Sequence, residues 1–353
     1  MIQKNLVVIS WSSLPTYAAY QIRSAIDYLS SYNIIIRVIA TSPRNFRSDI
    51  ESILDIVSVI WINQKSFYSW SSLGLSVPGV FFQSGWFCTA FNSLGREVKL
   101  NGGKVVCLAD NSWKANFRQR LGALAFRYQY SKLFDAVWVP GNSASRLMKF
   151  YGVSSNKIYQ GLYSADTDQF SSGISLDLRL KQFIFVGQII ERKGIKILLK
   201  AFERFHNHFP RWDLKIIGTG SLDKIQEIPN VYWEGIQSSS SIARAMSQSR
   251  FLILPSYEDH WGVVVHEAAC CGCGLILSDS VGASLDLLEE ANGFSFKSGD
   301  VSSLYDALVF ASQMNEYQLK SCFATSLKLA SLFNKDKWSK TFLKILMDLD
   351  STF

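Results

Sequence analysis

Short apolar runs alternate along this chain with longer stretches in which apolar residues recur every three or four positions. The runs in the first half are NLVVIS, IIIRVIA, VSVIWIN, GVFFQ and KVVCLAD, and those in the second half are FIFVG, DLKIIG, VYWEG, FLILP and GLILS. Such runs are too apolar for strands with one exposed face, and they are typical of parallel strands covered by helices on both faces. The pattern therefore predicts an α/β fold with two doubly wound, Rossmann-like domains.

The two series of strands are separated by SADTDQFSSGISLDLRLKQ, residues 164 to 182, which is poor in large apolar residues and rich in Ser and Asp. We place the interdomain linker there. The sequence thus predicts an N-terminal domain over residues 1–165, a C-terminal domain over 166–335, and a final helix within 336–353 that packs back on the N-terminal domain. We expect the two domains to face each other across a cleft, where small molecules usually bind.

Composition agrees with a globular protein of more than one domain. The chain has 353 residues, of which 48% are hydrophobic and 18% charged, and this excludes disorder. No apolar run approaches the roughly 20 residues that cross a bilayer, and LVVIS after Lys4 lacks the length and cleavage site of a signal peptide. We therefore expect a cytoplasmic protein with reduced cysteines.

Charge divides the chain unevenly. Residues 1–165 hold 17 Lys+Arg against 7 Asp+Glu, a balance of +10, whereas the remainder holds 19 against 22, a balance of −3. A basic half indicates an anionic partner, and three kinds fit: a phosphate-bearing substrate, an acidic membrane surface or nucleic acid. Alternatively, the lysines are solvated and only keep the protein soluble.

Residues that could bind a ligand or take part in catalysis follow three of the predicted strands in the second half. The first is FVGQIIERKG, where Arg192 and Lys193 precede a helix. A helix dipole disfavours cations at its N-terminus, so the pair makes sense if an anion binds there; a solvated turn is the alternative. The second is LKIIGTGSL, whose Gly218 and Gly220 let a ligand approach backbone N–H groups. The alternative is a turn without a ligand, which has the same sequence pattern. Neither half contains G-x-G-x-x-G, which argues against a dinucleotide dehydrogenase.

The third strand end is DHWGVVVHE, after the run FLILP. With Gly262 ending the loop, the N–H groups near Trp261 to Val264 suit a phosphate or sugar oxygen. Asp259 lies just before the predicted helix and Glu267 within it. Carboxylates at such positions bind sugar or ribose hydroxyls, and the alternative is that both acids only cap helices.

Together, FVGQ, RKG, IIGTGSL, VYWEG, LPSYEDHWGVVVHEAACCG, VGASLDLL and NGFSF resemble the C-terminal half of the retaining GT-B glycosyltransferases of family 4, over residues 183–305. The resemblance implies a GT-B fold and metal-independent transfer of a hexosyl or N-acetylhexosaminyl group from a nucleoside-diphosphate sugar to a hydroxyl acceptor. It points to polysaccharide, lipopolysaccharide or glycolipid assembly, with a lipid- or phosphate-linked acceptor. We expect a UDP-linked donor in preference to a GDP-linked one.

The resemblance also assigns residues. In that family a Glu-x7-Glu pair flanks the donor, and here Asp259 matches the member near the transferred sugar and Glu267 the one near the ribose. Lys193 matches the family's diphosphate lysine, while Gln188 replaces a usual arginine, whose charge Arg192 would supply. The predicted catalytic residues of this half are Asp259 and Lys193, and the predicted substrate-binding residues are Gly187, Gln188, Arg192, Gly218, Gly220, Trp261, Gly262, Val263 and Glu267. The segment from Tyr232 to Ile236 is expected to meet the base.

The N-terminal half departs from the family pattern. Its first loop reads WSSLPTYAAY in place of a Gly-Gly loop, so Ser13 or Thr16 would have to substitute for bare backbone. The family's histidine at the end of a middle strand has no match, because CLADNSW stands there. We expect catalytic Asp110 and substrate-binding Asn111 to take its place, with Thr16 also binding substrate.

The stretch SWKANFRQRLGALAFRYQYSKLF mixes basic and aromatic residues on a predicted helix. Such a helix suits an anionic membrane or a lipid-phosphate acceptor, although the mixture also suits RNA, and a core helix with a basic outer face is the alternative. We expect peripheral association with the inner face of the membrane and no nucleic-acid partner. Two rival functions remain for the chain: a sugar-nucleotide epimerase or phosphorylase of the same fold, and a non-catalytic nucleotide-sugar-binding protein.

Overall fold

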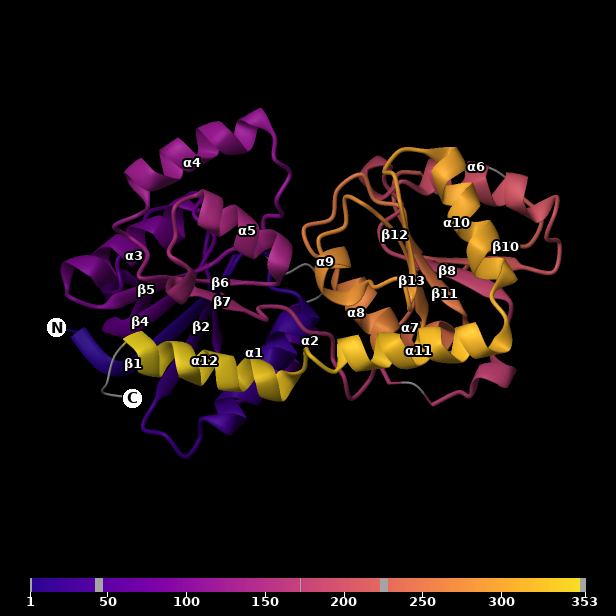
Figure 1. Ribbon diagram of the computed structural model, residues 1–353. Helices are drawn as coiled ribbons and strands as arrows, with labels where there is room; N and C mark the ends of the chain where they lie inside the picture. The colour runs from indigo at the N-terminus through magenta and orange to yellow at the C-terminus, as the bar shows by residue number, and fades with distance from the viewer. Residues whose placement is uncertain (1, 42–46, 172, 223–227, 350–353) are drawn as a thin grey trace. The chain divides into compact units, whose positions relative to one another are not determined.

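The computed structural model describes residues 2–41, 47–171, 173–222 and 228–349 (Figure 1). The chain forms two compact units. Unit 1 contains the residues up to Ser164 together with those from Lys335 onward, and unit 2 runs from Ala165 to Asn334. Unit 1 is therefore built from two separate pieces of chain, whereas unit 2 is one continuous piece.

Unit 1 contains a seven-stranded parallel sheet of order β3-β2-β1-β4-β5-β6-β7. Its strands are β1 (Ile2–Trp11), β2 (Ile35–Ala40), β3 (Val59–Trp61), β4 (Val77–Ser84), β5 (Lys104–Leu108), β6 (Ala136–Val139) and β7 (Ile158–Gln160). The strand order reverses between β1 and β4, which is the position where doubly wound sheets bind ligands.

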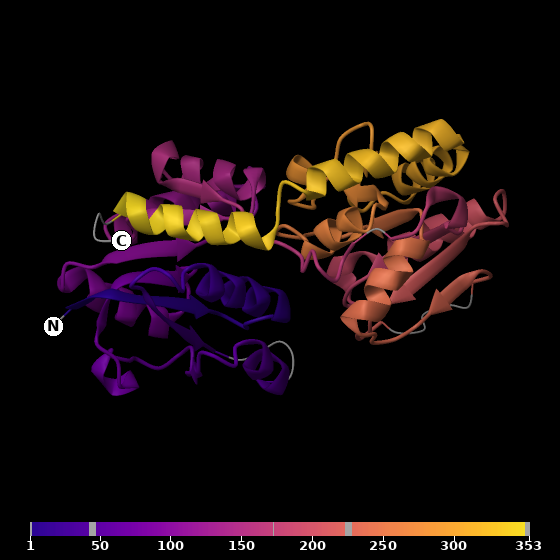
Figure 2. The same ribbon diagram turned by 90° about the horizontal axis from the view of Figure 1, so that it is seen from below.

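Helices cover both faces of this sheet (Figures 1 and 2). Val7, Ile9 and Trp11 of β1 enter one core with α1 (Thr16–Tyr28), α2 (Arg47–Ile53) and α12 (Lys335–Leu349). Leu6 and Val8 enter the other with α3 (Thr89–Leu100), α4 (Phe117–Gln129) and α5 (Asn142–Phe150). Successive residues of a strand point to opposite faces, so an unbroken apolar run is what a sheet covered on both sides needs.

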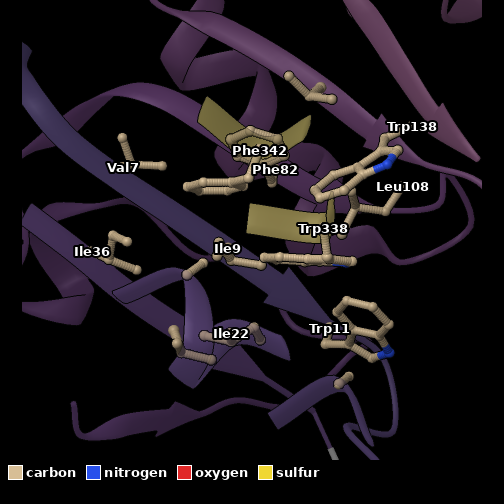
Figure 3. Packing of buried hydrophobic residues seen from close by; sticks show 14 of the residues in the cluster. Val7, Ile9, Trp11, Ile22, Ile36, Phe82, Leu108, Trp138, Trp338 and Phe342 are labelled. Atoms are coloured by element: carbon tan, nitrogen blue, oxygen red, sulfur yellow. The ribbon is translucent and has the colours of Figure 1, made fainter. Parts of the chain in front are cut away.

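Helix α12 completes the first of these cores (Figure 3). The ring of Phe342 stacks on Phe82 at 4.5 Å between centroids, and Trp338 lies 4.6 Å from Trp138. The Trp338 indole N–H donates to the Leu162 carbonyl at 2.9 Å. The final helix, expected within residues 336–353, thus begins at Lys335 and fills the space over β4 and β6.

Unit 2 contains a six-stranded parallel sheet of order β10-β9-β8-β11-β12-β13. Its strands are β8 (Gln182–Val186), β9 (Asp213–Ile217), β10 (Val231–Trp233), β11 (Phe251–Leu254), β12 (Gly274–Ser278) and β13 (Gly293–Phe296). Its helices are α6 (Ile195–His206), α7 (Ser239–Gln248), α8 (Val263–Cys270), α9 (Ser284–Leu287), α10 (Val301–Gln313) and α11 (Glu316–Ala330). Helix α6 packs with α10, and α8 packs with α7, α9 and α11 (Figure 1).

Both units also contain short 3₁₀ helices. Those of unit 1 are η1 (Ser71–Leu73) and η2 (Ser155–Lys157), and those of unit 2 are η3 (Leu176–Leu178) and η4 (Glu191–Lys193).

The two parallel sheets confirm the predicted α/β, doubly wound fold class. The predicted linker, in contrast, is too long. Arg179 lies near the end of that segment, yet it is buried in unit 2, where its guanidinium donates to the Ser249 and Cys271 carbonyls and lies over the Phe323 ring. The sequence did not indicate this contact, because the segment is polar and contains no apolar run. A single arginine side chain attaches this part of it to unit 2. Within the described part of the chain, no helix combines the length and apolarity that crossing a bilayer demands.

Candidate functional site

The strand order of unit 2 reverses between β8 and β11, and the loops after these strands contain most of the predicted site residues. The loops pack backbone against backbone. A Cβ atom on Gly218 would lie 1.9 Å from the Gly187 carbonyl oxygen, one on Gly220 2.2 Å from the Ile189 oxygen, and one on Gly194 2.0 Å from the Pro255 oxygen. Real Cβ atoms do not approach oxygens this closely, so these glycines are required for the loops to meet. The glycine-rich turns that the sequence singled out are structural parts of the site.

We expect Gly218→Ala to destabilise unit 2 by about 2–4 kcal/mol and to weaken nucleotide binding, because the loops must separate and the backbone is strained at φ +138°. Urea unfolding measures the first effect and ligand-induced thermal stabilisation the second. Gly173→Ala is the matched control, since nothing lies within 4 Å of its added Cβ. Equal stability of the two variants would contradict this account of the loops.

The structure brings together the two predicted catalytic residues of this unit. The Lys193 Nζ atom lies 2.5 Å from Asp259 Oδ2, and their side chains are only 13% and 12% exposed. Lys193 ends η4, after which Gly194 turns the chain into α6 at φ +71°. Asp259 is held from the other side, since its N–H donates to the Ser280 carbonyl and its own carbonyl accepts from Gly282. The ion pair thus joins the β8 loop to the β11 loop where the strand order reverses.

Arg192 and Gln188 are exposed on the same β8 loop. The Arg192 guanidinium donates to the Glu258 carbonyl at 2.6 Å, and its own carbonyl accepts from the Tyr257 N–H. Its positive charge therefore lies beside the Lys193–Asp259 pair. The segment expected to meet a base lies beyond β9: the Gly218 N–H donates to the Gly235 carbonyl at 2.7 Å, while Tyr232 and Ile236 are exposed.

The start of α8 offers backbone donors. Gly262 is its N-cap at φ +88°, and among the described residues nothing accepts from the N–H groups of Val263 and Val264. The Trp261 side chain is not available to a ligand, because it is buried and its indole N–H donates to Asp286 Oδ2 at 3.0 Å. Any contact between Trp261 and a ligand would therefore have to be made by its backbone.

Glu267 lies one turn into α8 and is half-buried. Burial raises the pKa of its carboxyl to about 7, and no donor within the described ranges pairs with this carboxylate. A half-buried acid without a partner is costly, since desolvation is not offset by a hydrogen bond. Such a group is typical of sites that bind a ligand's donors.

The next residue back along α8, His266, is fully buried and was not predicted to have a role. Its Nδ1 accepts from the Ala165 N–H at 2.8 Å, and its Nε2 lies 3.0 Å from the Ala330 carbonyl, to which it donates. Ala165 is the first residue of unit 2, and Ala330 lies four residues before its last. One imidazole therefore fixes the chain near both points where it passes between the units. No sequence signal distinguishes this histidine from a core residue.

We expect the free energy of unfolding to fall as the pH drops from about 6.5 to about 4. Burial lowers the pKa of His266 to about 4, so across that window the unfolded imidazole binds a proton that the folded one does not. The loss would reach about 3 kcal/mol. Urea unfolding at a series of pH values measures it, and His266→Gln should flatten the dependence whereas His208→Gln, at an exposed position, should not. An unchanged slope in His266→Gln would exclude His266 as its source.

In unit 1, Asp110 follows β5 and accepts a hydrogen bond from the Tyr163 hydroxyl at 3.0 Å. Burial raises the pKa of Tyr163 well above its usual value, and the negative charge of Asp110 adds to the shift, so the hydroxyl remains a donor. Tyr17 meets the Tyr163 ring edge-on at 5.6 Å, and Thr16 beside it begins α1. Asp110 and the start of α1 thus lie against the same tyrosine, which the sequence did not single out.

Two further N-terminal positions bear on the predictions. Asn111 is half-buried beside Asp110. Ser13 has φ +52°, a conformation that glycine adopts more readily, and its N–H donates to Thr41 Oγ1. The loop after β1 thus keeps a backbone shape suited to glycine although a serine stands there.

The cysteines and histidines do not form a metal centre: in the ranges that the structure describes, no group of three His, Cys, Asp or Glu residues could hold an ion. Cys270, Cys271 and Cys273 are buried free thiols. Burial raises the pKa of Cys271 to about 12 and that of Cys273 to about 11, so both stay protonated and pack as small residues.

This architecture consists of two α/β units of the Rossmann type, each with a parallel sheet, and the candidate site lies at the edge of the second sheet. It is the GT-B class of fold. Residues 166–320 match the family model of the glycosyl transferases group 1, a range within unit 2 that holds every predicted residue from Gly187 to Glu267. The match supports the prediction of a transferase.

The chain is similar to the uncharacterized glycosyltransferase MJ1059 of Methanocaldococcus jannaschii, with 27% identity over 146 residues that cover 36% of each chain. It thus spans about a third of the length of that curated relative. Among solved structures, a glycosyltransferase from Rickettsia africae has a TM-score of 0.74 at 13% identity, covering 98% of this chain and 99% of the other. Anabaena Alr3699/HepE in complex with UDP and glucose has a TM-score of 0.72 at 13% identity, covering 98% and 100%. At these identities the structural likeness concerns the fold alone.

Proposed function

We propose that the protein is a retaining glycosyltransferase of family 4 that moves a hexosyl or N-acetylhexosaminyl group from a UDP-sugar to a hydroxyl acceptor. The observation that carries the proposal is the Lys193–Asp259 ion pair at the strand-order reversal of unit 2. The family match over the same unit supports it, and the UDP bound to Anabaena Alr3699/HepE supports the choice of nucleotide.

The leaving diphosphate gains negative charge as the glycosidic bond breaks. Lys193 and Arg192 supply positive charge at the β8 loop, and the N–H groups of Val263 and Val264 supply donors at the start of α8. Groups that are already in place stabilise such charge without reorganisation, so electrostatic stabilisation is the main catalytic effect. Glu267 accepts from the ribose hydroxyls, and Asp259 lies near the transferred sugar. Lys193 and Arg192 supply the positive charge at the leaving group, and the resemblance implies enzymes without a metal, so we expect metal-independent transfer.

Retention follows if the acceptor attacks the face from which the diphosphate leaves. The bond from the anomeric carbon to the phosphate oxygen breaks, the bond to the acceptor oxygen forms, and the acceptor proton passes to the departing phosphate oxygen. No strong enzymic base is needed. The acceptor belongs to polysaccharide, lipopolysaccharide or glycolipid assembly, and the basic N-terminal unit favours a lipid- or phosphate-linked one at the inner face of the membrane.

Asp110 contacts the donor sugar or the acceptor hydroxyl in this proposal, with Asn111 beside it. Asp110→Ala and Asn111→Ala are each expected to lower kcat by about tenfold to a hundredfold, the range for one charge-assisted hydrogen bond. Tyr163→Phe, which removes the donor to Asp110, should have a smaller effect. Steady-state turnover measures these changes, with Asp49→Ala on α2 as the control at an exposed position. Full turnover in both Asp110→Ala and Asn111→Ala would show the assignment to be wrong.

Thermal shift against a panel of nucleoside diphosphates and their sugars tests the function first, because a specific ligand stabilises the folded state. UDP and one UDP-sugar should raise the melting temperature more than GDP compounds do. NMR of the product with a hydroxyl acceptor should then show the donor's anomeric configuration retained. Isomerised donor without an acceptor would indicate an epimerase instead, and UDP binding without any turnover would indicate a binding protein.

A further inference from the structure

Helix α4 lies on the outside of unit 1 (Figure 1), and four of its large hydrophobic side chains are exposed. Phe117, Leu121, Leu124 and Tyr128 are 70%, 54%, 65% and 90% exposed. At about 100° per residue these four side chains fall within an arc about 60° wide, so they form one stripe along the helix. We name them the α4 stripe. The alternative of a core-packed helix with a basic outer face describes α4 only in part, because one face does pack on the core but the centre of the outer face is apolar.

The opposite face of α4 is firmly attached to the unit. Phe126 is buried against Trp86 and Tyr151, at 5.1 and 5.3 Å between ring centroids. The Arg127 guanidinium donates to the Phe150 and Tyr151 carbonyls at the end of α5, at 2.9 and 3.1 Å. The α4 stripe thus stands on a helix that is already formed and docked, so exposing it is not the result of a loosely held segment.

Basic residues flank the stripe. On the same helical projection Arg120 lies on one side and Arg118 on the other, each within about 60° of its nearest stripe residue. Both arginines are exposed, as are Lys114 and Lys132 at the two ends of the segment. No Asp or Glu occurs from Asn111 to Phe134. An apolar stripe between rows of cations is the pattern of a helix that lies in the interface of an anionic bilayer.

We propose that the α4 stripe inserts into the interface of an anionic lipid bilayer, with Arg118 and Arg120 at the level of the lipid phosphates. The charge pattern selects this occupant. A second copy docked on the same stripe by twofold symmetry would place like charges opposite each other. RNA would gain nothing from Leu121 and Leu124, which cannot stack on bases as aromatic rings do. The inference rests on the proposed function in one respect, namely that it gives the enzyme access to a lipid-linked acceptor.

Co-sedimentation of the full chain with vesicles tests the proposal. Wild type should bind vesicles of phosphatidylcholine with phosphatidylglycerol, and bind those of phosphatidylcholine alone more weakly. Leu121→Ala with Leu124→Ala should lower the partition coefficient by roughly tenfold on anionic vesicles. The matched control is Leu178→Ala with Leu332→Ala, two leucines of unit 2 that are 69% and 54% exposed, and it should bind like wild type. Arg118→Gln with Arg120→Gln should lower binding to anionic vesicles by about thirtyfold and leave binding to phosphatidylcholine unchanged.

Binding that ignores anionic lipid, or that is equal in the stripe variant and wild type, would overturn the proposal. So would a dimer in solution that the stripe variant abolishes, or RNA binding that the arginine variant alone removes. Stabilisation by UDP separates this inference from the proposed function, because the nucleotide residues lie in unit 2. Vesicle binding through the stripe without UDP stabilisation would uphold the stripe proposal and contradict the proposed UDP-sugar site. UDP stabilisation without vesicle binding would overturn the stripe proposal and leave the UDP-sugar site supported.

Discussion

Lys193→Met is expected to lower kcat/KM by about a thousandfold while the protein remains folded. Lys193 supplies a positive charge in a largely desolvated place, 2.5 Å from Asp259, where the proposed leaving group gains charge. Removing one preorganised stabilising group from such a site typically costs a factor of 10² to 10³, and a full charge lies at the upper end. The measurement is steady-state release of UDP from the donor that thermal screening selects.

The matched control for Lys193 is Lys196→Met, because Lys196 lies three residues further along and pairs with Glu191 at an exposed position. It should retain activity within about twofold, since exposed ion pairs contribute little. Asp259 would lose its partner in Lys193→Met, so melting temperatures must accompany the kinetics. Lys193→Arg, which keeps the charge, should recover part of the activity. Wild-type kcat/KM in Lys193→Met would end the assignment of Lys193 to the diphosphate.

Glu267→Gln is expected to act in opposite directions on ligand binding and on stability. UDP affinity should fall by about tenfold to a hundredfold, because charge-assisted hydrogen bonds to the ribose are lost. Stability above pH 7 should rise. Burial raises the pKa of this carboxyl from 4.5 to about 7, so the folded state holds a proton that the unfolded state has lost, and stability falls as the pH rises through that window. Glutamine does not titrate, so the variant keeps the free energy of unfolding that wild type loses, which is at most about 3 kcal/mol.

The same carboxyl makes UDP affinity depend on pH. If Glu267 accepts from the ribose in its ionised form, as proposed, the UDP affinity of wild type should rise about tenfold between about pH 6 and pH 8 as Glu267 loses its proton. The terminal phosphate of UDP titrates near pH 6, but it does so for every variant. The informative quantity is therefore the difference from Glu267→Gln, measured by calorimetry, with Glu316→Gln, at an exposed position at the start of α11, as the control. Identical profiles for wild type and Glu267→Gln would remove Glu267 from the nucleotide site.

The sequence predicts the fold well because the information is local. The run LVVIS in β1 places apolar side chains on both faces of the sheet, and glycines occur just after the strands, where the loops meet. In unit 2 the spacing also places Lys193 and Asp259 on neighbouring loops, since both follow strands at the reversal of strand order. Parallel topology converts a position in the sequence into a position at one edge of the sheet.

Contacts between distant residues could not be predicted in the same way. Tyr163 holds Asp110 across 53 positions of sequence, and Arg179 reaches Cys271 across 92. His266 is held by hydrogen bonds to two backbone groups, the Ala165 N–H and the Ala330 carbonyl. Every residue has such backbone groups, so the sequence gives no sign of this contact. The leucines of the α4 stripe were not singled out for another reason, although the same helix was expected to meet a membrane. Leucines at helical spacing indicate a buried face, and only the position of Phe126 on the opposite side shows that they face outward.

The two-part construction of unit 1 has a consequence for the order in which the chain acquires structure on the ribosome. The sheet from β1 to β7 is made first, but the Trp338 and Phe342 rings that cover Phe82 and Trp138 are translated only after all of unit 2. Domains usually fold as they emerge, the N-terminal one first. Here the later-made unit is complete while the earlier one still lacks a helix, and the apolar side chains of β4 and β6 that α12 covers stay uncovered until α12 leaves the exit tunnel.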